Sequence, residues 1–105
     1  MPKQGKTPPP TLEEVLQTLQ EHLPALREQF SVKSLGVFGS YVRRENKPKS
    51  DLDLLVEFDH APTLFGFVRL QDHLSELLGV KVDLVMKSAL KPEIGRNILA
   101  EVVPV

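Results

Sequence analysis

One stretch of the sequence decides the fold: GSYVRRENKPKSDLDLLVEF, which runs from Gly39 to Phe58. It begins with a Gly-Ser turn, and a basic segment then leads to two carboxylates, Asp51 and Asp53, separated by one residue. Successive side chains of a β-strand point to opposite faces, so both carboxylates share one face of a predicted strand over residues 51–58. The other face is apolar and is predicted to be core; it carries Leu52, Leu54, Val56 and Phe58.

The carboxylate pair indicates a metal site. Two neighbouring carboxylates repel each other, and a hard divalent cation relieves the repulsion. Mg²⁺ is typically held by one or two carboxylates together with substrate phosphates. Upstream, Gly39 permits a tight turn, Ser40 supplies a hydroxyl, and Arg43 lies in a predicted short helix whose N-terminus favours anions. Phosphate contacts at one end and carboxylates at the other predict a nucleoside triphosphate site.

The combined motif, Gly39-Ser40 followed ten residues later by Asp51-x-Asp53, resembles the signature of the polymerase-β-like nucleotidyltransferase superfamily. The short chain and the later segment KVDLV, residues 81–85, are similar to the minimal nucleotidyltransferases. These are the antitoxin halves of HEPN/minimal-nucleotidyltransferase pairs. The resemblance covers roughly residues 12–105, with one departure: the family often has a small residue, Arg and Gly where this chain has Val42-Arg43-Arg44.

The resemblance implies an enzyme, a Mg²⁺-dependent protein adenylyltransferase. It would transfer AMP from ATP to a hydroxyl, expected to be that of a tyrosine, on a HEPN ribonuclease toxin. The implied site residues are Asp51, Asp53 and Asp83 as catalytic residues and ligands of a two-metal site, and Gly39, Ser40 and Arg43 as nucleotide-binding residues. A hetero-oligomer with the toxin is implied as well.

Two other hypotheses stay open. The chain could be a non-catalytic nucleotide-binding antitoxin that neutralises its partner by occlusion, or the catalytic subunit of a two-chain small-molecule nucleotidyltransferase. The intact Asp51/Asp53 pair favours an enzyme, because a protein that needs only a surface gains nothing from it. Plainer explanations exist for single residues: Asp83 stands between two lysines and could be solvated, and Arg43 and Arg44 could form a solvated basic turn.

Composition narrows the function classes. The chain has 105 residues, which suits one small domain; we expect a flexible lead over residues 1–10 and a nucleotidyltransferase domain over residues 11–105. There is no room for a separate acceptor-binding domain, so that surface is expected from a partner. The net charge of −1 argues against direct nucleic-acid binding, and the absence of cysteine excludes a thiolate site. No apolar run approaches the ~18 residues of a membrane span, so a cytoplasmic location without membrane contact is expected.

The pattern along the chain predicts an α/β fold, a small mixed β-sheet flanked by helices. We expect helices over residues 12–30, 64–78 and 92–100, and strands over residues 34–40, 51–58, 80–87 and 102–105. Thr11 should cap the first helix, which Pro24 should kink or split. If Ser40 and Asp51 serve one site, the first two strands run antiparallel, and a crossover helix then permits a parallel third strand that places Asp83 beside Asp53. Surface positions are predicted for Glu57, Asp59, His22, His60 and His73, and partner contacts for Phe65, Phe67 or residues 102–105.

Overall fold

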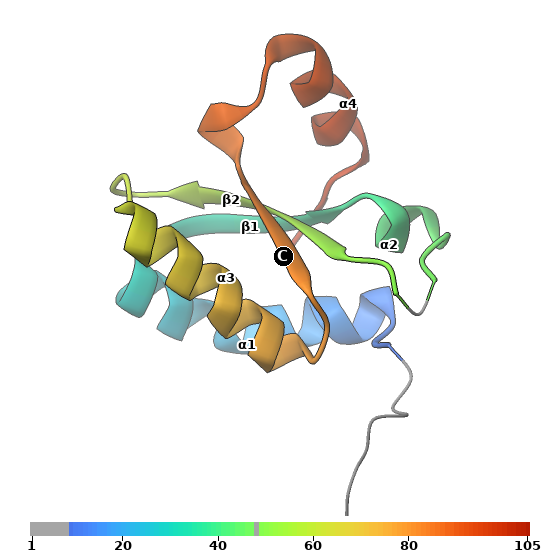
Figure 1. The fold of residues 1–105 in the computed structure, drawn as a ribbon, viewed down its shortest axis with the longest axis horizontal. Helices are drawn as coiled ribbons and strands as arrows, with labels where there is room; N and C mark the ends of the chain where they lie inside the picture. Colours follow the sequence, from blue (N-terminus) through green and yellow to red (C-terminus); the bar gives the residue numbers. More distant parts are fainter. Residues whose placement is uncertain (1–8, 48) are drawn as a thin grey trace, which may run out of the picture.

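A four-stranded mixed sheet with the order β3-β2-β1-β4 organises the chain (Figure 1). The structure is a computed structural model that describes residues 9–47 and 49–105. Its elements are α1 (Leu12–Phe30), β1 (Val32–Phe38), α2 (Ser40–Arg43), β2 (Leu52–Phe58), α3 (Leu64–Leu78), β3 (Val82–Met86), the 3₁₀ helix η1 (Lys87–Ala89), α4 (Pro92–Glu101) and β4 (Val103–Pro104). Residues 1–8 of the predicted flexible lead lie outside the described residues.

The topology confirms the predicted fold class. β1 and β2 pair antiparallel through the segment that contains α2, and β2 and β3 pair parallel across α3. β4 is a short edge strand that pairs antiparallel with β1, opposite Gly36 and Val37. The end of β1 and the starts of β2 and β3 therefore lie at the same end of the sheet, which brings the Gly-Ser turn and the carboxylates together.

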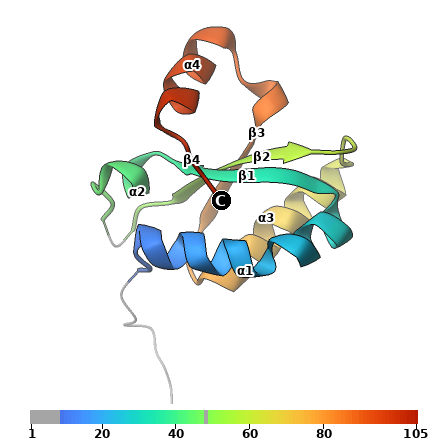
Figure 2. The ribbon, with the colours of Figure 1, turned by 180° about the vertical axis from the view of Figure 1, so that it is seen from behind.

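One face of the sheet forms the core. α1 and α3 lie side by side against that face, whereas α4 lies on the other side of the sheet (Figures 1 and 2). The core joins leucines of both helices to the inward face of β2; its fully buried members include Leu19, Leu26, Leu54, Val56, Leu70 and Leu74. The prediction that Leu52, Leu54 and Val56 face the core is confirmed, because none of them has exposed surface.

Helix α1 confirms one sequence prediction and contradicts another. Its capping box is present: the Thr11 N–H donates to Glu14 Oε1 at 2.8 Å, and the Glu14 N–H donates to Thr11 Oγ1 at 3.1 Å. Of the predicted kink or split at Pro24, the split is wrong, because α1 runs without a break for 19 residues. Pro24 removes one backbone donor, but Leu19 and Leu26 on either side of it are buried and hold both halves against the sheet.

Some predicted boundaries shift by one or two residues. β1 begins at Val32, because Ser31 adopts a left-handed conformation (φ 57°) that turns the chain directly from α1 into the sheet. It ends at Phe38, so Ser40 belongs to α2. α3 has the predicted ends: Thr63 Oγ1 accepts from the Gly66 N–H at 3.0 Å, and Gly79 ends the helix at φ 71°. Within the described ranges, no helix has the length and apolar character that crossing a membrane requires.

Candidate active site

Gly39 lies between the last residue of β1 and the first residue of α2, with φ 82° and ψ −151°. Glycine adopts this conformation without the steric cost that other residues pay. A Cβ at this position would also collide with the Asp53 carboxylate, because Phe38 pairs with Asp53 across the antiparallel strands. Gly39 therefore lies in close contact with a carboxylate of the candidate site.

Asp53 and Asp83 are register partners on the parallel strands β2 and β3. Neighbouring strands lie about 4.8 Å apart, so the two carboxylates start from adjacent backbone positions on one sheet face. Asp51 directly precedes β2, and its main chain is fixed by the Leu52 N–H, which donates to the Lys81 carbonyl oxygen at 2.9 Å. Asp53 is half-buried, whereas Asp51 and Asp83 are exposed. The strands thus bring together the three carboxylates that the sequence predicted as a unit.

The electrostatics of this group are unfavourable without a cation. Burial raises the pKa of Asp53 to about 6, and the charges of Asp83 and then Asp51 add to the shift. Arg43 acts in the opposite direction, and Glu101 raises the pKa further. A carboxyl group with a pKa of about 6 is mostly ionised at neutral pH, but its charge costs more here than on a free aspartate unless positive charge is supplied.

The donor set suits a hard divalent cation. Carboxylate oxygens are the ligands that Mg²⁺ prefers, and the mutual repulsion at Asp53 is what a cation would relieve. Within residues 9–47 and 49–105, no three acidic or histidine side chains are already close enough to enclose a metal ion. The carboxylates are therefore neighbours on the sheet without converging on one point, and the predicted three-carboxylate convergence is only partial.

The phosphate side of the predicted site is a single turn. Ser40 begins α2, which has only four residues and ends at Arg43, so a helix-dipole argument has little force here. Arg43 is exposed and close enough to Asp53 to lower that group's pKa. The assignment of phosphate binding consequently depends on the Arg43 guanidinium and on the Gly39-Ser40 turn rather than on a helix N-terminus.

Several other charged residues lie outside this group. Arg44 pairs with Glu13 of α1, so it supports the α2 turn from the α1 side. Glu57 lies towards the other end of β2, where Lys87 and Lys33 approach its carboxylate at 3.8 and 4.0 Å, in agreement with its predicted place outside the site. The histidines make no metal-ligand group in the described ranges: His22 contacts the Thr18 carbonyl, and the His73 ring lies 5.5 Å from that of Phe30.

Sequence reasoning missed Glu101. This residue ends α4 and binds Arg43 through both carboxylate oxygens, at 2.8 and 3.0 Å. The two residues are 58 positions apart, so no local pattern links them. One weak signal was available: a carboxylate in the last turn of a helix faces the negative end of the helix dipole and is unfavourable there unless another group holds it.

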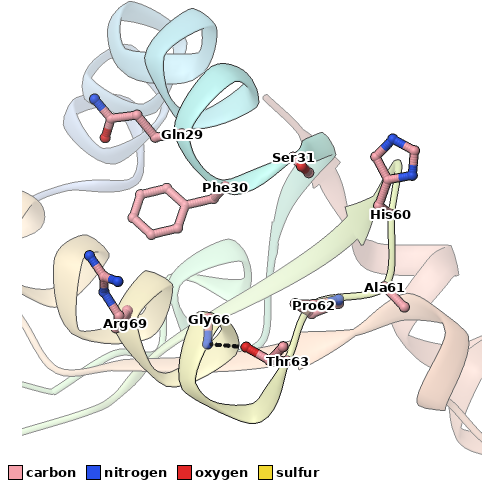
Figure 3. Close-up of a pocket in the computed structure, with 9 residues that line it drawn as sticks. All are labelled: Gln29, Phe30, Ser31, His60, Ala61, Pro62, Thr63, Gly66 and Arg69. Carbon is pink, nitrogen blue, oxygen red and sulfur yellow. Dashed lines mark hydrogen bonds between the residues drawn. The ribbon is translucent and has the colours of Figure 1, made fainter.

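A cavity of about 470 Å³ lies at the opposite end of the sheet from Gly39. Figure 3 shows that its wall includes the end of α1 with Phe30, the loop at His60, and the start of α3 with Thr63 and Arg69. None of its lining residues is acidic. It is therefore separate from the carboxylate group and contributes nothing to a metal site.

Comparison with known proteins gives a consistent result. A family model described as a nucleotidyltransferase domain matches residues 19–105. The protein adenylyltransferase MntA of Thermococcus cleftensis is 53% identical over 93 residues, which cover 89% of this chain and 94% of that protein. The range matched by the family model spans the positions of Gly39 and of the three carboxylates of the candidate site.

Solved structures extend the likeness to three dimensions. A structure described as a candidate minimal nucleotidyltransferase superposes with a TM-score of 0.77 at 37% identity, covering 96% of this chain and 100% of that chain. A Shewanella oneidensis complex of a tri-AMPylated HEPN toxin with an MNT antitoxin matches with a TM-score of 0.63 at 18% identity, covering 86% of this chain and 70% of that chain. At that identity, the second likeness is one of fold alone.

Proposed function

This chain belongs to the nucleotidyltransferase domain family, and from that premise we propose that it is a protein adenylyltransferase. It transfers AMP from ATP to a hydroxyl, that of a tyrosine, on a partner HEPN ribonuclease toxin, and so acts as the antitoxin of that toxin. The observation that carries the proposal is the register pair Asp53 and Asp83 beside Gly39, with the Asp53 pKa raised to about 6 by burial and by the neighbouring carboxylates. The 53% identity to a protein adenylyltransferase supports the choice of AMP and of a protein acceptor.

In this proposal Asp51, Asp53 and Asp83 would hold Mg²⁺, as a pair of ions. When bound, Mg²⁺ would offset the negative charge of the carboxylates and of the triphosphate. Asp53 has to be ionised to serve as a ligand, and because its pKa is raised, cation binding would displace the proton from the fraction of the groups that is still protonated. Gly39 leaves the Asp53 carboxylate free of a competing side chain.

The remaining residues position the substrates. Arg43 and the Gly39-Ser40 turn bind oxygens of the triphosphate, and Asp83, which is exposed, is accessible to an acceptor. The acceptor hydroxyl gives up its proton to water as its oxygen forms a bond to the α-phosphorus, the bond from that phosphorus to the β-phosphate oxygen breaks, and pyrophosphate leaves. Catalysis in such transfers comes mainly from positioning and charge stabilisation.

The partner surface is proposed from exposed apolar side chains at the start of α3. Leu64 and Phe65 are 80% and 83% exposed, whereas Phe67 packs against Phe58 with a ring distance of 6.5 Å. Of the predicted contacts, Phe65 is therefore the better candidate. Residues 103 and 104 are engaged with β1 and offer less free surface.

Mass spectrometry of the partner tests the proposal. The chain is co-expressed with its partner toxin, once as wild type and once with Asp51→Asn and Asp53→Asn. We expect the toxin to gain the mass of one or more AMP groups with the wild type only, and to stay inactive after the antitoxin is removed. Occlusion without transfer predicts an unmodified toxin, recovery of activity on separation, and equal neutralisation by the double variant. A two-chain small-molecule transferase predicts an unmodified partner and AMP on a small acceptor.

A further inference from the structure

Two carboxylates hold the Arg43 guanidinium from two sides. Glu45 accepts from Arg43 Nε at 3.0 Å, and both carboxylate oxygens of Glu101 accept from Nη1, at 2.8 and 3.0 Å. Arginine has five N–H donors in a rigid plane. Since Nε and Nη1 are engaged within the described part of the chain, the two donors on Nη2 are the ones that remain for a ligand.

The two carboxylates differ in how firmly they are placed. Glu45 is two residues from Arg43, and its side chain is 66% exposed, whereas the Glu101 side chain is 26% exposed. Exposed ion pairs contribute little, but a charge-assisted contact made by both carboxylate oxygens adds directional constraint. Glu101 is therefore the partner that can fix the direction of the guanidinium.

The main chain next to Glu101 is anchored to the strand that leads to the candidate site. Val103 pairs with Val37 of β1, and the Val105 N–H donates to the Leu35 carbonyl oxygen at 2.9 Å. Gly36 allows this close contact, because a Cβ there would lie 2.5 Å from Val102 Cγ2. β1 ends one residue before Gly39, and its pairing with β4 is antiparallel, so Glu101 and the Gly-Ser turn lie at the same end of the strand.

We propose that Glu101 is a positioning residue, which holds Arg43 so that its Nη2 donors point to the triphosphate. The proposal rests on the proposed function, since it assumes that Arg43 binds the nucleotide. Two carboxylates on one guanidinium leave no net positive charge at this position, so the contribution of Glu101 is directional rather than an increase in charge. A guanidinium that is already fixed loses less conformational freedom when it binds phosphate.

Replacing Glu101 distinguishes a positioning role from simple neutralisation of the positive charge of Arg43. If Glu101 positions Arg43, Glu101→Gln should raise the KM for ATP about tenfold and change kcat less than about threefold, because Arg43 binds phosphate in the ground state as well as in the transition state. If Glu101 only masked the positive charge of Arg43, the same change would tighten ATP binding. An unchanged or lower KM overturns the proposal.

A double-variant cycle tests whether Glu101 acts through Arg43. Arg43→Lys cannot present the planar donor set, so adding Glu101→Gln to it should cause little further loss. Glu93→Gln is the matched control, because it makes the same charge change in the first turn of α4. It should leave the KM for ATP at the wild-type value. Additive losses in the cycle overturn the proposal.

Direct binding of a non-hydrolysable ATP analogue, measured by calorimetry, keeps this result distinct from the proposed function. If the wild type and Glu101→Gln bind the analogue equally well, the proposed role of Glu101 is overturned, but the proposed function is not. Wild type that binds no analogue and transfers no AMP overturns the proposed function and this role with it. Thermal unfolding of each variant checks the fold, and Glu101→Asp, which keeps the charge on a shorter side chain, should give an intermediate KM.

Discussion

The α-carbon of Gly39 lies against the carboxylate of Asp53, so closely that a methyl group at position 39 would overlap a carboxylate oxygen. The two residues come from strands that pair antiparallel, one at the end of β1 and the other near the start of β2. The Gly-Ser half and the carboxylate half of the predicted motif are therefore in direct contact, so a substitution at Gly39 should displace the Asp53 carboxylate.

Gly39→Ala is expected to abolish most of the activity. The backbone conformation of Gly39 (φ 82°, ψ −151°) is essentially confined to glycine and should cost about 1–3 kcal/mol of stability, and displacement of the Asp53 carboxylate should lower the transfer rate roughly 100-fold or more. Gly79→Ala is the matched control, because Gly79 also has a positive φ (71°) but a Cβ there meets nothing within 4 Å. Because its αL conformation (φ 71°, ψ 22°) costs alanine about 1–2 kcal/mol, Gly79→Ala should lose stability and keep its transfer rate. Equal transfer rates for Gly39→Ala and Gly79→Ala in a labelled-ATP assay would contradict the assignment of Gly39 and Asp53 to the active site.

The raised pKa of Asp53 predicts a pH-dependent stability. Its unfolded pKa is near 3.8 and its folded pKa is about 6, so the folded state binds more protons between these values. Stability of the metal-free protein should therefore fall as pH rises through that window, and Asp53→Asn should remove the loss. At about pH 7 we expect the variant to be more stable by about 1 kcal/mol or less, since solvent screens a half-exposed group. Urea unfolding across the window tests this, with exposed Asp59→Asn as the control.

Mg²⁺ and ATP together should stabilise the wild type and not the carboxylate variant. A ligand that binds only the folded state contributes about 2.7 kcal/mol at 100 times its Kd. Thermal unfolding with Mg²⁺ alone, ATP alone and both should show the largest shift for both. In Asp51→Asn/Asp53→Asn the combined shift should disappear. A shift of equal size in that variant would place the nucleotide elsewhere.

Tyr41 should tolerate loss of its hydroxyl. The side chain is 2% exposed, its hydroxyl has no hydrogen-bond partner among the described residues, and burial raises its pKa. An unpaired buried hydroxyl carries a desolvation cost, so Tyr41→Phe should be neutral or stabilising by up to about 1 kcal/mol. Chemical unfolding provides the measurement. A loss of more than about 1 kcal/mol would mean that the hydroxyl has a partner in solution.

Phe65→Ser should weaken binding of the partner toxin without affecting the fold. Phe65 is 83% exposed, so its replacement removes little from the core. Asp72→Ser, at an exposed position on the same helix, serves as the control. Gel filtration and calorimetry should show weaker complex formation for Phe65→Ser only. Unaltered affinity of Phe65→Ser for the toxin would mean that the toxin binds another face of the molecule.

Local chemistry explains why much of the fold was predictable. Thr63 and Gly79 bound α3 because a capping hydroxyl and a left-handed glycine act on their immediate neighbours. The alternation of Asp51, Leu52 and Asp53 separates the carboxylates from the core because a strand has a two-residue period. These features depend only on residues that are neighbours in the sequence, so they could be predicted from it.

The features that sequence reasoning missed depend on tertiary contacts. Pro24 remains inside α1 because buried leucines on both sides offset its missing donor. Phe65 and Phe67 look equivalent in sequence, yet they face different directions on α3, and only Phe67 packs against Phe58. The pair Glu101 and Arg43 depends on the path of the chain after α4, which no local pattern encodes.

The strand pairing has a consequence for the order in which the protein folds. Gly39 and Asp53 are joined by a short loop, so closing one hairpin brings them together at a small loss of chain entropy. Asp83 reaches Asp53 only after α3 has formed and docked, because the parallel pair requires the whole crossover. We expect hydrogen exchange during refolding to show β1 and β2 protected before β3, so that the carboxylate group is completed in the later step.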